Sequence, residues 1–495
     1  MNAAYDVIII GAGLSGIGMA CQLAQKNPNK NFTILERRQA IGGTWDLFRY
    51  PGIRSDSDMI SFGYGFNPWT GNQVLAAGES IRQYVQDTAE KFGLAQKIQF
   101  GIKIISADFS TATNQWTVKA VDEQTGESKE FVCNYLVSAT GYYNHDQGYL
   151  PKFEGEEDYQ GIRVHPQHWP EDLDYSNKKV VVIGSGATAV TVVPAMADKT
   201  AHITMLQRSP SYVFNIPNTD KILDACKKIL PEDVVYKMFR KRNIFIQRSL
   251  FKLSRRFPEK MRSFLIDSVR KQLGDDYDMS HFTPKYMPRD ERLCAVPDGD
   301  LFEAIKSGKA SVVTDHIDRF TENGILLKSG KTLEADIIIT ATGLQIQMLG
   351  GIQVTVDHEK INPGDKMSYK GVLLEDVPNF AYLFGYTNAP WTLKIDLACD
   401  YICRLIQEMD KRQVAAVKPV APAGENTGKS IVSSLQSGYV QRGDGVMPRQ
   451  GRSTEWLVTH SFEKDSAMFG QAIDASALVW THTTASRMDF KAKVA

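Results

Sequence analysis

The sequence predicts an α/β fold with two doubly wound domains, one of them interrupted by the other, and an additional helical insertion. An apolar strand runs directly into a glycine-rich turn and a helix at residues 7–16, and the same pattern returns at residues 180–189. Such a unit opens a parallel sheet in doubly wound folds. Residues 138–141 (Ser-Ala-Thr-Gly) and 340–343 (Thr-Ala-Thr-Gly) both end apolar strands, which indicates two matching crossings between the domains.

The first unit has the features of a dinucleotide-binding (Rossmann-like) turn. Gly11 allows a tight turn, Gly13 lets a pyrophosphate approach the backbone, and Gly16 lets the helix that starts near Ser15 pack on the strand. The phosphates would lie at the amino-terminus of that helix. Glu36 ends the second strand, twenty residues after Gly16, where a carboxylate accepts hydrogen bonds from a ribose diol. This unit therefore suits FAD or NAD.

The second unit differs from the first in the residues that would contact the ribose. Its turn and the start of its helix comprise Gly184, Ser185, Gly186, Ala187, Thr188 and Ala189. At the end of the next strand Gln207 replaces the acid, and Arg208 could bind a ribose 2′-phosphate through charge-assisted hydrogen bonds. The second unit therefore favours NADPH, and the chain is expected to hold two dinucleotides.

Composition excludes several classes of function. The 495 residues include 57 Lys or Arg and 57 Asp or Glu, and 43% are hydrophobic. Two or three domains are expected from the length, and the balanced charge gives no field that would recruit nucleic acid. The six cysteines form no Cys-x-x-Cys pair and no cluster with histidine, so we expect reduced thiols, no metal and a cytoplasmic chain. We expect no signal peptide and no transmembrane segment.

Residues 221–271 are expected to form the helical insertion. They contain fifteen Lys or Arg against five Asp or Glu, interleaved with apolar residues at helical spacing. We favour amphipathic helices that cover a pocket and leave their basic side chains in solvent. A weak peripheral contact with a membrane surface is the alternative. No feature of the sequence sets an oligomeric state.

Two bound dinucleotides leave three classes of redox enzyme. A disulfide reductase relays electrons to a closely spaced thiol pair, which this sequence lacks. A flavin oxidase or dehydrogenase and an oxygen-inserting enzyme remain.

Two longer motifs carry a specific resemblance. Residues 159–170 read Tyr-Gln-Gly-Ile-Arg-Val-His-Pro-Gln-His-Trp-Pro and match F-x-G-x-x-x-H-x-x-x-W-[PD], with Tyr159 in place of Phe. Residues 42–56 match [AG]-G-x-W-x-x-x-x-[FY]-P-[GM]-x-x-x-D at every fixed position. With these motifs the chain resembles the type I Baeyer–Villiger monooxygenases, which are class B flavoprotein monooxygenases. The amino-acid sequence of residues 292–294 and 386–394 resembles that of the ethionamide-activating branch.

The resemblance implies a reaction. NADPH would reduce FAD, O2 would add to flavin carbon C4a, and the resulting peroxyflavin would insert one oxygen atom next to the carbonyl of a small ketone to give an ester or lactone. Transfer to a sulfide would be a side activity. Water discharges such a peroxide, so the pocket must be closed. The developing negative charge calls for a cation that keeps its proton, which favours arginine over lysine.

The resemblance also implies which residues act. Arg292 would be the catalytic arginine, with Arg289 as its competitor, and Asp56 would hold Arg292 and touch the flavin region. The remaining residues are expected to contact the cofactors: Gly43, Thr44, Trp45, Asp46 and Leu47 at the isoalloxazine, Arg54 and Ser55 at the nicotinamide nucleotide, and Ile104 at the adenine. Trp391 could also stack near the flavin, whereas His165 is expected to be structural or to form a hinge.

The sequence therefore predicts an FAD-containing, NADPH-dependent Baeyer–Villiger monooxygenase. The alternatives are a flavin-containing monooxygenase that oxidises sulfur or nitrogen and, outside enzymes, a redox sensor that binds both nucleotides. We expect the FAD-binding domain at residues 1–145 and 344–495 (including a C-terminal tail), the NADP-binding domain at residues 146–215 and 282–343, and the helical insertion at residues 216–281.

Overall fold

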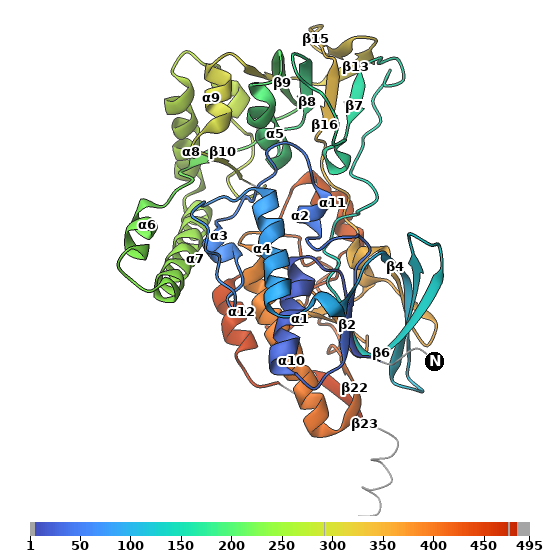
Figure 1. The fold of residues 1–495 in the computed structure, drawn as a ribbon. Coiled ribbons are helices and arrows are strands. Elements are labelled where there is room, and N and C mark those ends of the chain that lie inside the picture. The colour runs from blue at the N-terminus through green and yellow to red at the C-terminus, as the bar shows by residue number, and fades with distance from the viewer. Residues whose placement is uncertain (1–4, 292, 474–475, 483–495) are drawn as a thin grey trace, which may run out of the picture.

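A computed structural model describes residues 5–291, 293–473 and 476–482. Figure 1 shows two β-sheets at opposite ends of the molecule, each with helices packed against it. The larger sheet lies in the lower half of this view and the smaller sheet in the upper half.

The larger sheet contains the first glycine turn. Its strand order is β18-β17-β4-β5-β6-β1-β2-β3, and β21 pairs with β6 beside this path. The central strand β1 is parallel to β2 and β6, and its last four residues are buried. The strands are β1 (Tyr5–Ile10), β2 (Phe32–Leu35), β3 (Ile98–Gln99), β4 (Ile102–Ser110), β5 (Gln115–Asp122), β6 (Ser128–Ser138), β17 (Gln353–Val356), β18 (Glu359–Ile361) and β21 (Phe380–Tyr382).

The smaller sheet contains the second glycine turn and is parallel throughout. Its order is β12-β9-β8-β16-β7. The strands are β7 (Ile162–Val164), β8 (Lys179–Ile183), β9 (His202–Gln207), β12 (Ala310–Thr314) and β16 (Ile337–Thr340). Helices α5 (Ala187–Ala197) and α9 (Asp300–Lys306) share one apolar core with this sheet.

The chain order of the strands confirms the predicted α/β class, with one doubly wound unit interrupted by the other. All strands of the smaller sheet fall between residues 162 and 340, and the larger sheet takes strands from both sides of that interval. The two crossings run antiparallel, since Asn144 N donates to Gln345 O at 2.8 Å and Gln347 N donates to Tyr142 O at 3.1 Å. The domain boundaries at residues 145, 215, 281 and 343 stay predictions.

Helices on the larger sheet explain why the first core is so apolar. Figure 1 shows α1 (Leu14–Lys26), α4 (Gly78–Lys91) and α10 (Trp391–Arg412) grouped on one face of this sheet. Residues of all three belong to a single buried cluster. The C-terminal helix α12 (Phe462–Phe469) joins α10 through a buried ion pair, in which Lys394 Nζ lies 2.7 Å from Asp465 Oδ2.

The helical insertion consists of α6 (Lys221–Lys227), α7 (Glu232–Arg256) and α8 (Pro258–Leu273). In Figure 1 these helices form the left edge of the molecule. The remaining elements are short: α2 (Thr44–Leu47), α3 (Met59–Phe62), α11 (Gly438–Gly443), β10 (Val213–Ile216), β11 (Cys294–Pro297), β13 (Ile317–Thr321), β14 (Gly324–Leu327), β15 (Thr332–Glu334), β19 (Ser368–Tyr369), β20 (Leu373–Leu374), β22 (Val414–Pro419) and β23 (Leu478–His482).

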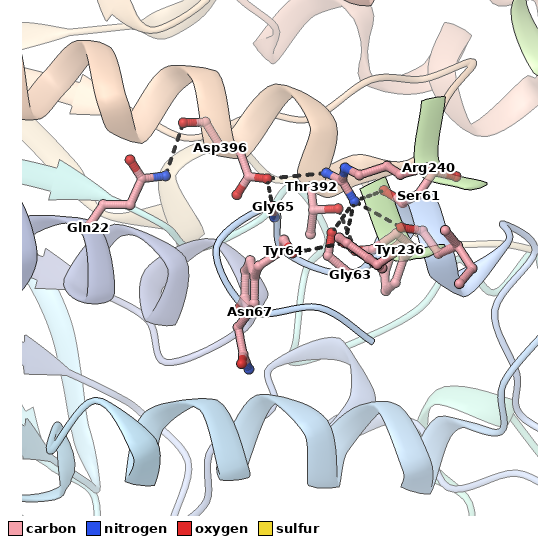
Figure 2. Close-up of polar contacts among 12 residues, drawn as sticks. Gln22, Ser61, Gly63, Tyr64, Gly65, Asn67, Tyr236, Arg240, Thr392 and Asp396 are labelled. Atoms are coloured by element: carbon pink, nitrogen blue, oxygen red, sulfur yellow. Dashed lines mark hydrogen bonds and ion pairs between the residues drawn. The ribbon is translucent and has the colours of Figure 1, made fainter. Parts of the chain in front are cut away.

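One arginine attaches α7 to the rest of the chain, as Figure 2 shows. Arg240 Nη1 donates to the carbonyl oxygens of Ile60, Ser61 and Gly63, at 3.0, 3.2 and 2.7 Å. Its Nη2 lies 3.3 Å from Asp396 Oδ2 on α10. The last carbonyls of α3 have no partner inside that short helix, so the guanidinium satisfies them and fixes α7 over the loop that follows.

Candidate functional site

A cavity of about 1340 Å³ lies where the first glycine turn, the loop at residues 42–58 and the helices α6 and α7 meet. Its walls include glycine and small side chains from the larger sheet and apolar side chains from the insertion. Among the lining residues are Gly11, Gly13, Ser15, Glu36, Gly43, Thr44, Trp45, Asp56, Ile104, Ile222, Ile246, Leu250, Phe251 and Arg289.

The first turn presents bare backbone to this cavity. Gly11 has φ +102°, and a Cβ there would lie 2.8 Å from Ala139 O, so only glycine fits. Helix α1 begins after Gly13, and no side chain caps its free amides. The amino-terminus of α1 is therefore available to an anion. Gly16 lies in the first turn of α1, packed inside the sheet–helix core.

Glu36 is buried beside this turn, as a ribose-binding carboxylate should be. Its Oε2 accepts from Ala12 N at 2.6 Å and its Oε1 from Arg38 N at 2.8 Å. Burial raises the pKa of Glu36, and the two backbone donors oppose that rise. The neighbouring Ile104 lies on β4 and lines the same cavity.

The second turn repeats the geometry of the first at the smaller sheet. Gly184 has φ +144°, and a Cβ there would lie 2.4 Å from Ala341 O, just as Gly11 faces Ala139. Helix α5 follows Gly186 without a side-chain cap. A Cβ at Gly186 would meet no described atom within 4 Å, so the space above the turn is open. None of residues 184–189 lines the large cavity, which leaves this turn for a separate ligand.

Gln207 and Arg208, the two residues predicted to contact the ribose in the second unit, differ in their exposure to solvent. Gln207 is buried, and its Nε2 donates to His281 O and to Thr314 Oγ1, each at 2.8 Å. Arg208 is exposed, and its charge opposes the rise that burial causes in the pKa of Glu291. Because Glu291 lines the large cavity, Arg208 lies near the edge of that cavity.

Some residues of the loop at residues 42–56 line the cavity and others do not. Thr44 and Trp45 line the cavity, together with Gly43. Asp46 instead pairs with Arg38 at 2.7 Å and with Arg49 at 2.5 Å. Leu47 belongs to the apolar core of the smaller sheet.

The end of that loop connects the two units. Arg54 pairs with Asp300 at the start of α9, with 2.5 Å between Nη1 and Oδ2. Ser55 is buried, and its Oγ donates to Ser57 O at 2.8 Å. Asp56 lines the cavity, whereas Arg54 and Ser55 do not. The loop therefore joins the cavity to the domain that carries the second turn.

The predicted catalytic Arg292 lies outside the described residues. Its competitor Arg289 lines the cavity and lies over the ring of Phe251, with 5.9 Å between the guanidinium carbon and the ring centre. Burial lowers the pKa of Arg289. Its Nε is buried and has no hydrogen-bond partner among the described residues. Arg289 is thus one of several basic residues on the cavity wall, with Arg37, Lys103, Lys221, Arg242 and Arg255.

Two aromatic residues, Trp391 and Tyr142, contact each other on the cavity wall, and the sequence predicted only Trp391 near the flavin. Trp391 Nε1 donates to Ser15 Oγ at 2.8 Å, and its ring stacks on that of Tyr142 at 5.5 Å. Both rings line the cavity. Tyr142 was not predicted, although it follows the crossing motif by one residue. Asn388 also lines the cavity, and its buried Oδ1 has no hydrogen-bond partner in the part of the chain that the structure describes.

The sequence interpretation also missed how polar residues of α7 hold the loop. Asn243 Nδ2 donates to Asp58 Oδ1 at 2.7 Å, and Gln247 donates to the other oxygen of Asp58. Asp58 caps α3 by accepting from Ser61 N at 3.0 Å. The Asp-x-x-Ser spacing is an N-cap signal that could have identified Asp58.

His165 caps a short helical turn, in keeping with the structural role expected from the sequence. Its Nδ1 accepts from Gln167 N at 3.2 Å and begins a short helical turn. Burial lowers the pKa of His165, which favours the neutral ring. His165 does not line the large cavity.

The described residues contain neither a candidate metal site nor a candidate membrane-spanning helix. Among them no group of three or more His, Cys, Asp or Glu side chains is arranged to bind a metal. No helix within the described ranges combines the length and the apolar character needed to cross a bilayer.

The comparisons define the class of protein. A family model described as "Flavin-binding monooxygenase-like" matches residues 4–362, and the chain belongs to this family. The uncapped first turn, the loop at residues 42–58 and every strand of the larger sheet except β21 lie within the matched part.

Similar individual proteins carry monooxygenase names. The chain is 56% identical over 470 residues to the putative FAD-containing monooxygenase MymA of Mycobacterium tuberculosis, which covers 94% of this chain and 95% of MymA. It is 50% identical over 466 residues to the probable FAD-binding monooxygenase AlmA of Acinetobacter baylyi (94% and 93% covered). It is 47% identical over 467 residues to the FAD-containing monooxygenase EthA of Mycobacterium tuberculosis (94% and 95% covered).

Solved structures share the fold. An oxidised steroid monooxygenase bound to NADP matches with a TM-score of 0.78 and 21% identity, over 97% of this chain and 100% of that one. Cyclohexanone monooxygenase from Rhodococcus sp. Phi1 bound to NADP⁺ matches with a TM-score of 0.76 and 20% identity, over 98% and 100%.

Proposed function

We propose that the protein is an FAD-containing, NADPH-dependent Baeyer–Villiger monooxygenase. It inserts one oxygen atom from O2 next to the carbonyl of a small ketone, to give an ester or lactone, and oxidises sulfides as a side activity. The other oxygen atom leaves as water, and NADPH supplies two electrons. The observation that carries the proposal is the cavity, in which an uncapped glycine turn, Asp56 and an apolar wall meet.

The residues around the first turn fit FAD. Bare glycine backbone at the start of α1 suits its pyrophosphate, and Glu36 suits its ribose. Trp45, Trp391 and the unpartnered Asn388 Oδ1 line the cavity where a flavin ring would lie. FAD, when bound, would supply the redox chemistry that activates O2 with electrons from NADPH.

The residues around the second turn fit NADPH. The turn at Gly184 and Gly186 is open and uncapped, and Arg208 is exposed beside it. Arg208 would bind the 2′-phosphate, because a planar guanidinium forms paired hydrogen bonds with phosphate oxygens. Arg54, through Asp300, and Ser55 would hold the connection between this nucleotide and the cavity.

The protein's own groups would then stabilise negative charge and exclude water. Arg292 would face the oxyanion that forms when oxygen adds to the carbonyl, and Asp56 would orient Arg292. Ile246, Leu250 and Phe251 line the cavity from α7 and would keep water away from the reacting oxygen.

Product identification tests the proposal. Purified holoenzyme is incubated in air with NADPH and a panel of cyclic and linear ketones, and products are identified by mass spectrometry. Esters or lactones are expected. If hydrogen peroxide were the sole product from every ketone, the proposal would be wrong.

The two alternatives give different results in the same assay. A heteroatom monooxygenase would form sulfoxides or hydroxylamines and leave ketones unchanged. A redox sensor would bind both nucleotides without turnover, whereas we expect NADPH to bleach the yellow protein rapidly and air to restore its colour.

A further inference from the structure

Helix α7 and the segment that joins it to α6 carry large apolar side chains that face solvent. The exposed fraction is 82% for Ile229 and 64% for Phe245, and Val234 and Met238 are also exposed. Val234, Met238 and Phe245 follow one another at positions i, i+4 and i+11, so they form one stripe along α7. Soluble monomers rarely expose apolar clusters of this kind, which mark an interaction surface. We call this surface the insertion face.

Helix α6 belongs to the same surface. Leu223 of α6 is buried against Val235, Tyr236 and Phe239 of α7, so the two helices pack as one unit. Figure 1 shows this unit projecting at the left edge of the molecule, away from both sheets. The insertion face can therefore reach a flat partner without a clash from the rest of the molecule.

Basic residues accompany the apolar stripe. The insertion holds fifteen Lys or Arg against five Asp or Glu at residues 221–271. Lys241 lies on the stripe between Met238 and Phe245, and Lys252 continues it. Lys228, Lys241 and Lys252 are exposed, and none of them belongs to an ion pair within the described part of the chain. Apolar side chains with interspersed free lysines match an anionic lipid surface, which offers headgroup charge above an apolar layer.

The insertion face continues into the cavity. Ile222 on α6 and Ile246 and Leu250 on α7 line the cavity. The same three side chains are also exposed, by 66%, 44% and 45%. A ligand that leaves the apolar layer of a bilayer would therefore meet these three apolar side chains at the rim of the cavity.

We propose that the insertion face docks the enzyme on anionic lipid bilayers and that the cavity takes lipophilic substrates directly from the bilayer. Docking is independent of the reaction. The uptake of substrate rests on the proposed function.

Vesicle flotation tests the docking. The holoenzyme is mixed with vesicles of phosphatidylcholine alone or of phosphatidylcholine with phosphatidylglycerol, and the bound fraction is measured over a range of salt concentrations. We expect binding to the anionic vesicles that weakens as salt rises. Lys241→Ala/Lys252→Ala should bind about 25-fold more weakly, because each lysine near such a surface contributes about 1 kcal/mol, or roughly fivefold. Ile229→Ser/Phe245→Ser should also lose binding.

Matched variants at other exposed sites serve as controls. Lys119→Ala/Lys360→Ala and Ile162→Ser/Val479→Ser change exposed residues on β5, β18, β7 and β23, and should bind as the unchanged protein does. The proposal is wrong if the holoenzyme does not float with anionic vesicles, or if the control variants lose as much binding as the insertion variants. It is also wrong if analytical ultracentrifugation shows the insertion face buried by a second copy, with Ile229→Ser/Phe245→Ser separating the copies.

Substrate uptake is tested with two ketones. Turnover of a long-chain ketone held in anionic vesicles should fall at least tenfold in Ile229→Ser/Phe245→Ser, while turnover of a short water-soluble ketone stays unchanged. Equal loss for both ketones would overturn uptake from the bilayer. If no ketone is oxidised by any form, the proposed function fails, and the flotation result still decides the docking.

Discussion

At the scale of single residues, the account depends on a fixed positive charge beside a place where negative charge develops. A guanidinium keeps its proton throughout such a reaction, unlike an ammonium group in an apolar pocket. Two arginines are candidates. Arg292 is implied by the family resemblance, and its competitor Arg289 is one of several basic residues that line the cavity.

Replacing Arg292 and Arg289 one at a time shows which of them stabilises the negative charge. Arg292→Ala should leave reduction of the flavin by NADPH intact and slow ester formation by roughly a hundredfold to a thousandfold, because one electrostatic stabiliser contributes about 3 to 4 kcal/mol to the barrier. Arg289→Ala is the matched control and should retain most product formation. Stopped-flow absorbance measures reduction, and gas chromatography measures the ester. The reverse result would assign the catalytic charge to Arg289.

Arg208 is the residue that we propose to set the preference for NADPH over NADH. Arg208→Ala should raise the KM for NADPH roughly tenfold or more and leave that for NADH nearly unchanged, because a charge-assisted hydrogen bond is worth about 1.5 to 3 kcal/mol. Steady-state kinetics with both cofactors measures the ratio. Arg319→Ala, at an exposed arginine on β13, is the control. An equal change for both cofactors would show that Arg208 does not read the 2′-phosphate.

At the scale of elements, buried ion pairs attach helices whose local sequence does not position them. Lys394 on α10 and Asp465 on α12 are each only 4% exposed, and Tyr386 Oη also donates to Asp465, at 2.8 Å. Burial lowers the pKa of Lys394, and the nearby carboxylate opposes that change. This pair fixes the C-terminal helix beside the residue Tyr386 of the cavity.

Breaking this pair on one side should be costly. Lys394→Met leaves Asp465 buried without its cation, and we expect a loss of about 3 to 5 kcal/mol in the free energy of unfolding. Lys394→Met/Asp465→Leu removes both charges and should recover much of that loss. Denaturant unfolding at constant FAD concentration measures both. The single variant Asp465→Leu completes the comparison. If the double variant lost as much free energy of unfolding as the two single variants lose in sum, Lys394 and Asp465 would not be coupled.

The attachment of α7 should depend on pH. Burial raises the pKa of Asp396 to about 6, while Arg240, Gly65 N and Lys26 oppose the rise. Folding therefore favours the protonated carboxyl. The stability from this group is fully present below its unfolded pKa near 4 and is lost as pH rises through about 6, by at most about 1.4 kcal/mol per pH unit.

Asp396→Asn tests this dependence. The difference in unfolding free energy between the unchanged protein and the variant should fall between pH 4 and pH 6 and be constant above that range. Asp410→Asn, at an exposed position near the end of α10, is the control. A difference that does not vary with pH would place the pKa of Asp396 at its ordinary value.

At the scale of the whole molecule, the sequence predicted those parts of the fold that depend on interactions between residues close together in the chain. Both glycine turns, the two sheets and their interrupted order follow from apolar strands and from positions such as Gly11 and Gly184 that exclude a Cβ. The acid Glu36 was also placed correctly beside its turn. Each of these features is set by neighbours within a few residues along the chain or by one parallel strand.

Contacts between distant segments could not be predicted in this way. Asp46 is held by two arginines and Leu47 joins the core of the other sheet, and neither contact follows from the loop motif; their places at the isoalloxazine stay predictions. Gln207 is occupied by His281 and Thr314. Tyr142 meets Trp391 only because the segment that follows β6 comes close to the start of α10. These positions depend on tertiary packing, which no local pattern records.

The central claim is that this arrangement passes one atom of O2 to an organic substrate. Incubation under ¹⁸O2 with NADPH and a ketone, followed by mass spectrometry, measures it most directly. We expect the ester to carry one labelled oxygen atom, with one ester formed for each NADPH oxidised. An unlabelled ester, or NADPH oxidation that ends entirely in labelled hydrogen peroxide, would contradict the account.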